Sequence, residues 1–210
     1  QARGGNDTLR SAGKFVYTTF RGKDHVGLQQ YSTKADADMD SLNSFGNFET
    51  LPPYTKGQVS YPLGRVLRGA TKSWHPDQSF MRMVDSQKVQ PSIEIDTSWL
   101  SVGHEDETMS FVRADTERGW VLLVNDARLA KKILEDAQKA GHGGTKMFVG
   151  LSWGRGQSAE TTIDAVLADQ DVMAASTSAA AEVDAQLAKV KLETGLTDAE
   201  IIRVPYLHEE

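Results

Sequence analysis

The clearest pattern of apolar and polar positions lies between residues 93 and 125. Alternate positions from Ile93 to Trp99 carry Ile, Ile, Thr and Trp, with more polar residues between them. This alternation is typical of a strand with one buried face. Two apolar runs follow at 109–113 and 120–125, and the polar stretch between them ends in Gly119. The spacing predicts a β-hairpin.

A helical period follows the hairpin. From Asp126 to Ala140, apolar residues recur at intervals of three and four, which is typical of an amphipathic helix. Asp126 is a suitable N-cap residue, and Gly141 is a suitable stop. Residues 147–151 then form a short apolar run that predicts another strand. The predicted order of this unit is therefore strand, strand, helix, strand.

The segments on either side of this unit predict further elements. Residues 15–20 and 59–67 predict strands because β-branched and aromatic residues gather there, and 78–87 predicts a short helix. Residues 159–193 are rich in Ala, Leu, Glu and Lys, so they predict one long helix or a broken pair, ended by Gly195.

The C-terminal residues complete the prediction of fold class. Thr197 and Glu200 have the spacing of a capping box, and residues 201–207 predict a final strand. The order of strands and helices along the whole chain predicts an α+β or α/β protein with mixed sheets.

Composition and charge narrow the function classes. A chain of 210 residues with 39% hydrophobic content can bury the core of one ordinary domain or of two small ones. Its net charge of −6 includes no basic stripe or polybasic cluster, so nucleic acid and lipid are not expected partners. No apolar run approaches the roughly 20 residues that cross a bilayer, so no membrane association is expected. Gln1 is neither a start residue nor the opening of a signal peptide, which suggests processing or excision from a longer chain.

The sequence contains no cysteine. Disulfides, thiolate metal sites and a cysteine nucleophile within these residues are therefore excluded. The same absence favours a cytoplasmic location, where disulfides are rare.

Residues 101–107 carry the candidate chemistry. If the backbone is extended there, His104 and Asp106 project to one side, while Glu105 and Glu107 project to the other. An imidazole that moves protons near neutral pH, beside a carboxylate that holds a cation, suits hydrolysis of a nitrogen-rich substrate. The spacing alone favours hydrated surface charges on a loop, because His-x-Asp is a common pattern.

The residues around this pair are similar to a known family. Asp96 to Glu107 (DTSWLSVGHEDE) strongly resembles the histidine segment of protein-arginine deiminases. Ser44 to Glu49 (SFGNFE), followed by two prolines and then by residues 61–65 (YPLGR), resembles the calcium segment of the same family in the same order. Residues 141–143 (GHG) and 195–202 (GLTDAEII) also resemble the family. The resemblance covers residues from about 40 to the C-terminus.

The resemblance implies a fold and a reaction. The fold is an incomplete pentein-type propeller, built of ββαβ units, and residues 1–210 would form part of its catalytic domain. The reaction is the hydrolytic deimination of arginine in a protein or peptide substrate to citrulline, with release of ammonia. His104 would transfer protons, and Asp106 would be one of two aspartates that bind the planar guanidinium.

Two parts of the family's active site are missing from the sequence. The second aspartate would lie before Gln1, and the nucleophilic cysteine would lie after Glu210. Residues 1–210 alone are therefore predicted to form no citrulline. A propeller cut between units also leaves strand edges and apolar faces uncovered, which favours self-association.

The resemblance also implies calcium. Glu49 would bind the ion through its carboxylate, and Phe45 and Phe48 would bind it through their backbone carbonyls. The alternative is that both phenylalanines are core residues and that Glu49 is a surface charge. Asp7, Thr8 and Ser11 could supply part of a second calcium site.

Three residues match positions that contact substrate in the family. Gly46 and Val102 match the lining of the arginine channel, and Arg10 matches an arginine that holds the substrate backbone. For Arg10, a solvated side chain near the chain end is an equally good interpretation.

Two other function classes remain open at this level. One is a metal-dependent hydrolase with His104 and Asp106 as ligands, together with Glu49 or Glu107. The other is a noncatalytic calcium-binding or interaction module that keeps the deiminase-like segments as a scaffold.

Overall fold

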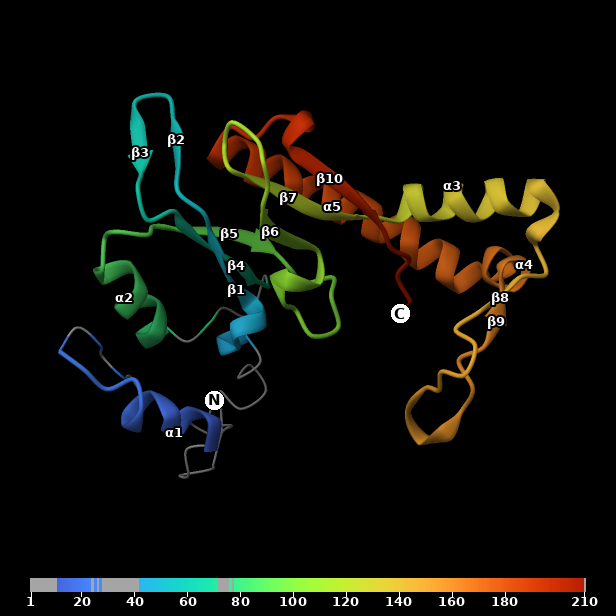
Figure 1. Ribbon diagram of the computed structural model, residues 1–210, viewed down its shortest axis with the longest axis horizontal. Coiled ribbons are helices and arrows are strands. Elements are labelled where there is room, and N and C mark those ends of the chain that lie inside the picture. The colour runs from blue at the N-terminus through green and yellow to red at the C-terminus, as the bar shows by residue number, and fades with distance from the viewer. Residues whose placement is uncertain are drawn as a thin grey trace. The chain divides into compact units, whose positions relative to one another are not determined.

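The computed structural model describes residues 11–23, 25, 27, 42–71, 76 and 78–209. The chain divides into two units, residues 1–107 and residues 108–210. Each unit contains a small three-stranded sheet with helices (Figure 1). The α+β class expected from the sequence is confirmed, while the pentein propeller stays a prediction.

The sheet of the first unit has β4 (Arg65–Ala70) in its centre. β1 (Phe48–Leu51) pairs with it in antiparallel register, and β5 (Ser92–Asp96) pairs with it in parallel register. Parallel neighbours need a crossover connection, and α2 (Gln78–Ser86) lies in it. The predictions of a strand near 93 and of a helix at 78–87 are confirmed.

The predicted strand at 59–67 is divided into two. β3 (Val59–Tyr61) forms a hairpin with β2 (Tyr54–Lys56), whereas β4 starts only at Arg65. Between β3 and β4, Gly64 adopts a φ of 72°, and its N–H donates to the carbonyl of Tyr61. The turn at this glycine separates the two strands.

The prediction of a strand at residues 15–20 is wrong. Residues Ser11–Thr18 form the helix α1, and the chain stays helix-like to Thr19, whose N–H donates to the Phe15 carbonyl. The rings of Phe15 and Phe20 meet edge to face, with centroids 4.8 Å apart. The β-propensity of such residues reflects packing on a sheet, and here the aromatic side chains pack on each other instead.

The sheet of the second unit begins with the predicted hairpin. β6 (Met109–Arg113) and β7 (Trp120–Asp126) are antiparallel, and β10 (Ile201–Pro205) is parallel to β7 on its other side. α3 (Ala127–Ala137) follows, and its N-cap Asp126 accepts a hydrogen bond from the Leu129 N–H at 2.9 Å, as expected.

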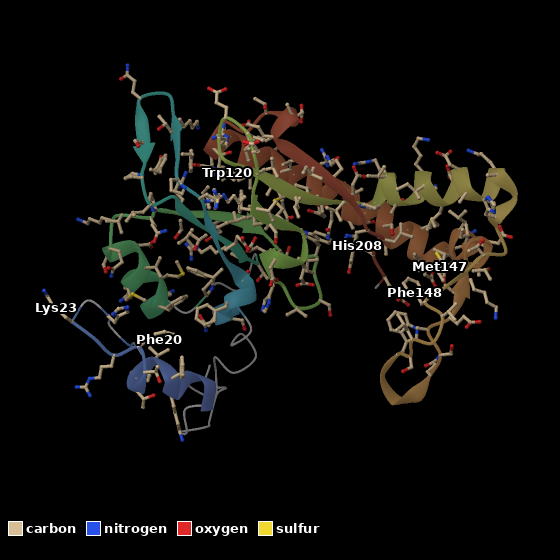
Figure 2. The ribbon with its side chains drawn as sticks, viewed as in Figure 1. Phe20, Lys23, Trp120, Met147, Phe148 and His208 are labelled. Atoms are coloured by element: carbon tan, nitrogen blue, oxygen red, sulfur yellow. The ribbon has the colours of Figure 1, made fainter. Side chains whose placement is uncertain are left out.

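The predicted strand at 147–151 is wrong. β8 consists only of Lys146–Met147, and it pairs with β9 (Thr161–Thr162). Just after β8 comes Phe148, whose side chain is labelled in Figure 2. Its φ is 57°, so the chain leaves extended geometry there. The parallel strand that completes the sheet is therefore β10, which comes much later in the sequence.

The C-terminal helical region is a broken pair, one of the two expected arrangements. α4 (Ile163–Ala168) and α5 (Gln170–Thr194) meet at Asp169, which caps α5 by accepting from the N–H groups of Asp171 and Val172. Gly195 ends α5 in the left-handed conformation, as predicted. No helix within the described residues is long and apolar enough to cross a membrane.

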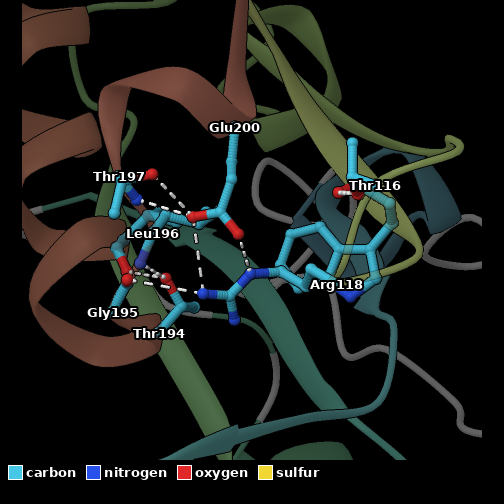
Figure 3. A network of polar contacts seen from close by, with 9 residues as sticks. Thr116, Arg118, Thr194, Gly195, Leu196, Thr197 and Glu200 are labelled. Atoms are coloured by element: carbon cyan, nitrogen blue, oxygen red, sulfur yellow. Dashed lines mark hydrogen bonds and ion pairs between the residues drawn. The ribbon is translucent and has the colours of Figure 1, made fainter.

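The predicted capping box at Thr197 and Glu200 is present, and it belongs to a larger network (Figure 3). Glu200 accepts from the Thr197 N–H at 2.9 Å and from Arg118 Nε at 2.6 Å. Arg118 lies on the turn between β6 and β7. The network therefore ties the hairpin to the segment between α5 and β10.

Candidate functional site

A tight turn precedes β1 and presents Gly46. The 3-10 helix η2 (Phe45–Asn47) is closed by two backbone bonds, from the Asn47 N–H to the Ser44 carbonyl and from the Phe48 N–H to the Phe45 carbonyl. The Phe45 side chain is 94% exposed, so the interpretation of Phe45 as a core residue is wrong. The Phe48 ring packs on Phe80 of α2, with centroids 5.1 Å apart.

The candidate catalytic pair meets over Gly46. A Cβ placed on Gly46 would lie 2.6 Å from His104 Nδ1 and 2.8 Å from Asp106 Oδ2. Both distances are shorter than real Cβ contacts, so the two side chains occupy the space that only a glycine leaves open. An imidazole and a carboxylate thus converge on one backbone position, and the Asp106 side of the site is exposed to solvent.

The backbone that carries the pair is not extended. Residues Glu105–Glu107 form the 3-10 helix η3 after Gly103, which has a φ of 81°. The His104 N–H donates to Glu107 Oε1 at 2.9 Å, which satisfies a donor at the start of this turn. His104 and Asp106 therefore share a face because of a turn, whereas the expectation of strand alternation as the cause is wrong.

Glu105 lies between the pair in sequence and is fully buried. Burial, and after it the nearby carboxylates of Glu49 and Asp106, raises the pKa of Glu105 to about 9. The interpretation of the whole run 105–107 as hydrated surface charge is therefore wrong for its first member. A carboxyl group in this setting is neutral at pH 7.

Asn47 is a site residue that the sequence reasoning missed. Its side chain is fully buried, and its Nδ2 donates to the carbonyls of Leu42 at 3.0 Å and of Gly69 at 2.9 Å. Its Oδ1 accepts from the Gly69 N–H at 2.9 Å and from the Glu105 N–H at 3.3 Å. One amide thus connects η2, β4 and η3. The sequence carries no local signal for it, because its partners Gly69 and Glu105 lie 22 and 58 positions away.

The residues proposed for substrate contact are only partly described. Gly46 adjoins His104 and Asp106 as stated above, and Val102 is 52% exposed two residues before His104. Arg10 lies outside the described residues, as do Asp7 and Thr8 of the suggested second calcium site.

The calcium candidates lie together on η2 and the start of β1. Phe45, Phe48 and Glu49 offer two backbone carbonyls and one carboxylate, which are hard oxygen ligands of the kind calcium takes. Glu49 is half-buried and close enough to raise the pKa of Glu105, so a cation beside Glu49 would offset the repulsion between these two carboxyl groups. The set fits calcium in kind, and three ligands leave several of the usual six to eight to other residues. Among the described residues, no group of three or more His, Cys, Asp or Glu side chains is arranged to hold a metal ion.

Comparisons with known proteins give a consistent result. The sequence matches the family model described as Protein-arginine deiminase (PAD) over residues 6–210. Protein-arginine deiminase type-3 of Rattus norvegicus is 34% identical over 176 residues, which cover 82% of this chain and 26% of that protein. Type-4 of Mus musculus is 33% identical over 176 residues, with coverages of 81% and 26%. Type-1 of Homo sapiens is 33% identical over 171 residues, with coverages of 80% and 25%. The chain spans about a quarter of the length of these relatives.

Proposed function

Because the chain belongs to the protein-arginine deiminase family, we propose that it contributes part of an active site that converts peptidyl arginine to peptidyl citrulline. In this reaction water replaces one guanidinium nitrogen, which leaves as ammonia. The observation that carries the proposal is the convergence of His104 and Asp106 on Gly46. A proton-transfer group and an anionic group that converge beside one backbone position suit a planar, cationic substrate.

Each residue of the pair has a separate task. Asp106 is exposed, so its carboxylate is available to accept hydrogen bonds from two guanidinium nitrogens. His104 is half-buried, and its Nδ1 faces the same position. Its imidazole would donate a proton to the departing ammonia and accept one from the incoming water.

The neighbouring residues would receive the rest of the arginine side chain. Gly46 has no Cβ, so His104 and Asp106 can approach its backbone closely and present their side chains to the guanidinium. Val102 presents an exposed apolar side chain that suits the methylene stem of arginine. Arg10 would hold the substrate backbone.

The nucleophile must come from outside residues 1–210. Attack on the guanidinium carbon requires a thiolate in this family, and the chain contains no cysteine. The thiolate would form a covalent bond to this carbon as ammonia leaves, and water would then break that bond to release citrulline. Residues 1–210 alone therefore form no citrulline in this proposal.

Calcium would support this site through Phe45, Phe48 and Glu49. The ion would offset the charge of Glu49 and hold the turn that presents Gly46, with further ligands supplied by other parts of the protein. It takes no part in the bond-breaking steps assigned to His104 and Asp106.

The proposal is tested by citrulline formation from an arginine peptide, with and without calcium. The full-length gene product, its His104→Ala variant and residues 1–210 alone are assayed side by side. We expect calcium-dependent activity only in the unmodified full-length protein. Absence of activity there would overturn the proposal in favour of a noncatalytic binding module, and citrulline formation by residues 1–210 alone would refute the role of an external thiol.

A further inference from the structure

The buried amide of Asn47 joins three backbone segments of the first unit. Its four hydrogen bonds all go to backbone groups, two of them to the N–H and the carbonyl of Gly69. These two hydrogen bonds to one residue resemble the pairing of neighbouring strands, so they hold η2 at a fixed distance from β4. The fourth bond, from the Glu105 N–H, holds η3 against the same oxygen.

These hydrogen bonds lie next to the candidate site. Gly46 directly precedes Asn47, while the Glu105 N–H lies between His104 and Asp106 in the chain. The Asn47 oxygen therefore links the residue next to Gly46 to the residue between His104 and Asp106 through one hydrogen bond. Because the Asn47 side chain is 0% exposed, it cannot touch a substrate.

We infer that Asn47 is a positioning residue that sets the approach of His104 and Asp106 to Gly46 by bonding the Glu105 backbone. Its effect on turnover rests on the deiminase function proposed above. Its effect on the geometry of the pair does not depend on that function. Displacements of about 1 Å at a reacting group can lower turnover about a hundredfold, so a single backbone bond at this place has large leverage.

Two substitutions at Asn47 separate positioning from general stability. Asn47→Leu removes the acceptor for the Glu105 N–H and both donors. Asn47→Asp keeps an acceptor oxygen of the same size but loses donor capacity and buries an acid. We therefore expect Asn47→Asp to be at least as destabilised as Asn47→Leu, and yet to keep more of the catalytic rate.

Gly69 offers a second route that leaves Asn47 unchanged. A Cβ on Gly69 would lie 2.4 Å from Asn47 Oδ1 and 2.5 Å from Thr97 Cγ2, so Gly69→Ala pushes both the amide and the Thr97 side chain away from their places. If Asn47→Leu fails to fold, Gly69→Ala and Asn47→Asp still perturb the same bond. Arg65→Lys is the matched control, because it weakens buried bonds to the carbonyls of Pro91 and Ser92 at the other end of β4.

The first measurement is independent of activity. NMR spectra of the His104 imidazole and hydrogen exchange at the Glu105 amide are recorded for the full-length protein and each variant. We expect Asn47→Leu and Gly69→Ala to shift the imidazole signals and to speed exchange at Glu105 by at least about tenfold relative to Arg65→Lys. Unchanged signals and exchange in both would overturn the inference, even if the full-length protein proves to have no deiminase activity.

The second measurement is the kcat for an arginine peptide, taken well below the melting temperature of every variant. We expect kcat to fall about a hundredfold in Asn47→Leu, less in Asn47→Asp, and no more than about twofold in Arg65→Lys. KM should change less than kcat, because Asn47 does not touch substrate. A loss of kcat that simply follows stability, with Arg65→Lys affected as strongly, would refute the positioning role and leave the proposed deiminase function intact.

Discussion

His104 Nδ1 lies 2.6 Å from the place where a Cβ on Gly46 would stand, although the two residues are far apart in the sequence. Gly46 does not have a positive φ, so its backbone conformation does not require a glycine. The lack of a side chain is needed because His104 and Asp106 fill the place where a Cβ would lie. The site should therefore be sensitive even to the replacement of Gly46 by alanine.

Gly46→Ala should lower kcat for an arginine peptide by about a hundredfold, because the methyl group displaces both His104 and Asp106. Steady-state kinetics of the full-length protein would measure this. Stability should change little, since Gly46 is partly exposed and its neighbours can move. Gly144→Ala is the control, because nothing lies within 4 Å of its Cβ position. Full activity in Gly46→Ala would contradict the placement of the reacting groups.

Glu105→Gln should stabilise the protein above neutral pH in the absence of calcium. The pKa of Glu105 rises from 4.5 to about 9 on folding, so the folded state favours the protonated form. The contribution of the protonated carboxyl group to the stability of the folded state is fully present below pH 4.5 and is lost as the pH rises through 9. Glutamine mimics the neutral acid, so it removes this loss, on the order of 2 kcal/mol at pH 8 after relaxation around the charge.

Denaturant unfolding at pH 5 and pH 8 would measure the difference between the wild-type protein and Glu105→Gln. The gain should be larger at pH 8. Glu117→Gln is the control, because that carboxylate is exposed on the turn between β6 and β7. Parallel pH profiles for wild type and Glu105→Gln would show that Glu105 is ionised in the folded protein.

Glu200→Gln should destabilise the second unit at neutral pH and have little effect in acid. The hydrogen bond from Arg118 is the main reason that the pKa of Glu200 falls to about 2, and bonds from Thr197 add to it (Figure 3). This contribution is present above pH 4.5 and is lost as the pH falls through 2. We expect a cost of about 1 kcal/mol at pH 7, because solvent partly screens the pair. Glu182→Gln, exposed on α5, should cost much less. Equal costs at pH 7 and pH 2.5 would argue against the ion pair.

Local sequence signals explain which elements could be predicted. The hairpin of β6 and β7, the cap at Asp126 and the end of α5 at Gly195 follow from periodicity and capping residues, which act within a few positions. The strand predicted at 147–151 fails because Phe148 adopts a left-handed conformation, which apolar content does not reveal. The strand predicted at 15–20 fails because an aromatic, β-branched run carries no fixed preference without a sheet to pack on.

The candidate site divides in the same way. The pair His104 and Asp106 could be proposed only from the resemblance of residues 96–107 to protein-arginine deiminases, because the His-x-Asp spacing alone favours hydrated surface charges on a loop. The amide of Asn47 bonds Glu105 across 58 positions, and Glu105 itself is buried only in the folded chain. No pattern near either residue reports such a contact, so only the folded structure identifies them.

Calcium binding by the full-length protein should depend on Glu49 much more than on the side chain of Phe45. Glu49→Gln removes a negative ligand, and we expect the affinity for calcium to fall by at least about tenfold. Phe45→Ala keeps the backbone carbonyl and removes a ring that is 94% exposed, so affinity should remain within about twofold. Isothermal titration with calcium chloride measures both affinities without any assay of activity.

Glu94→Gln is a control for charge, because Glu94 lies on β5 in an ion pair with Arg68. If Phe45→Ala lost as much affinity as Glu49→Gln, or if Glu94→Gln did, the assignment of calcium to this turn would be wrong.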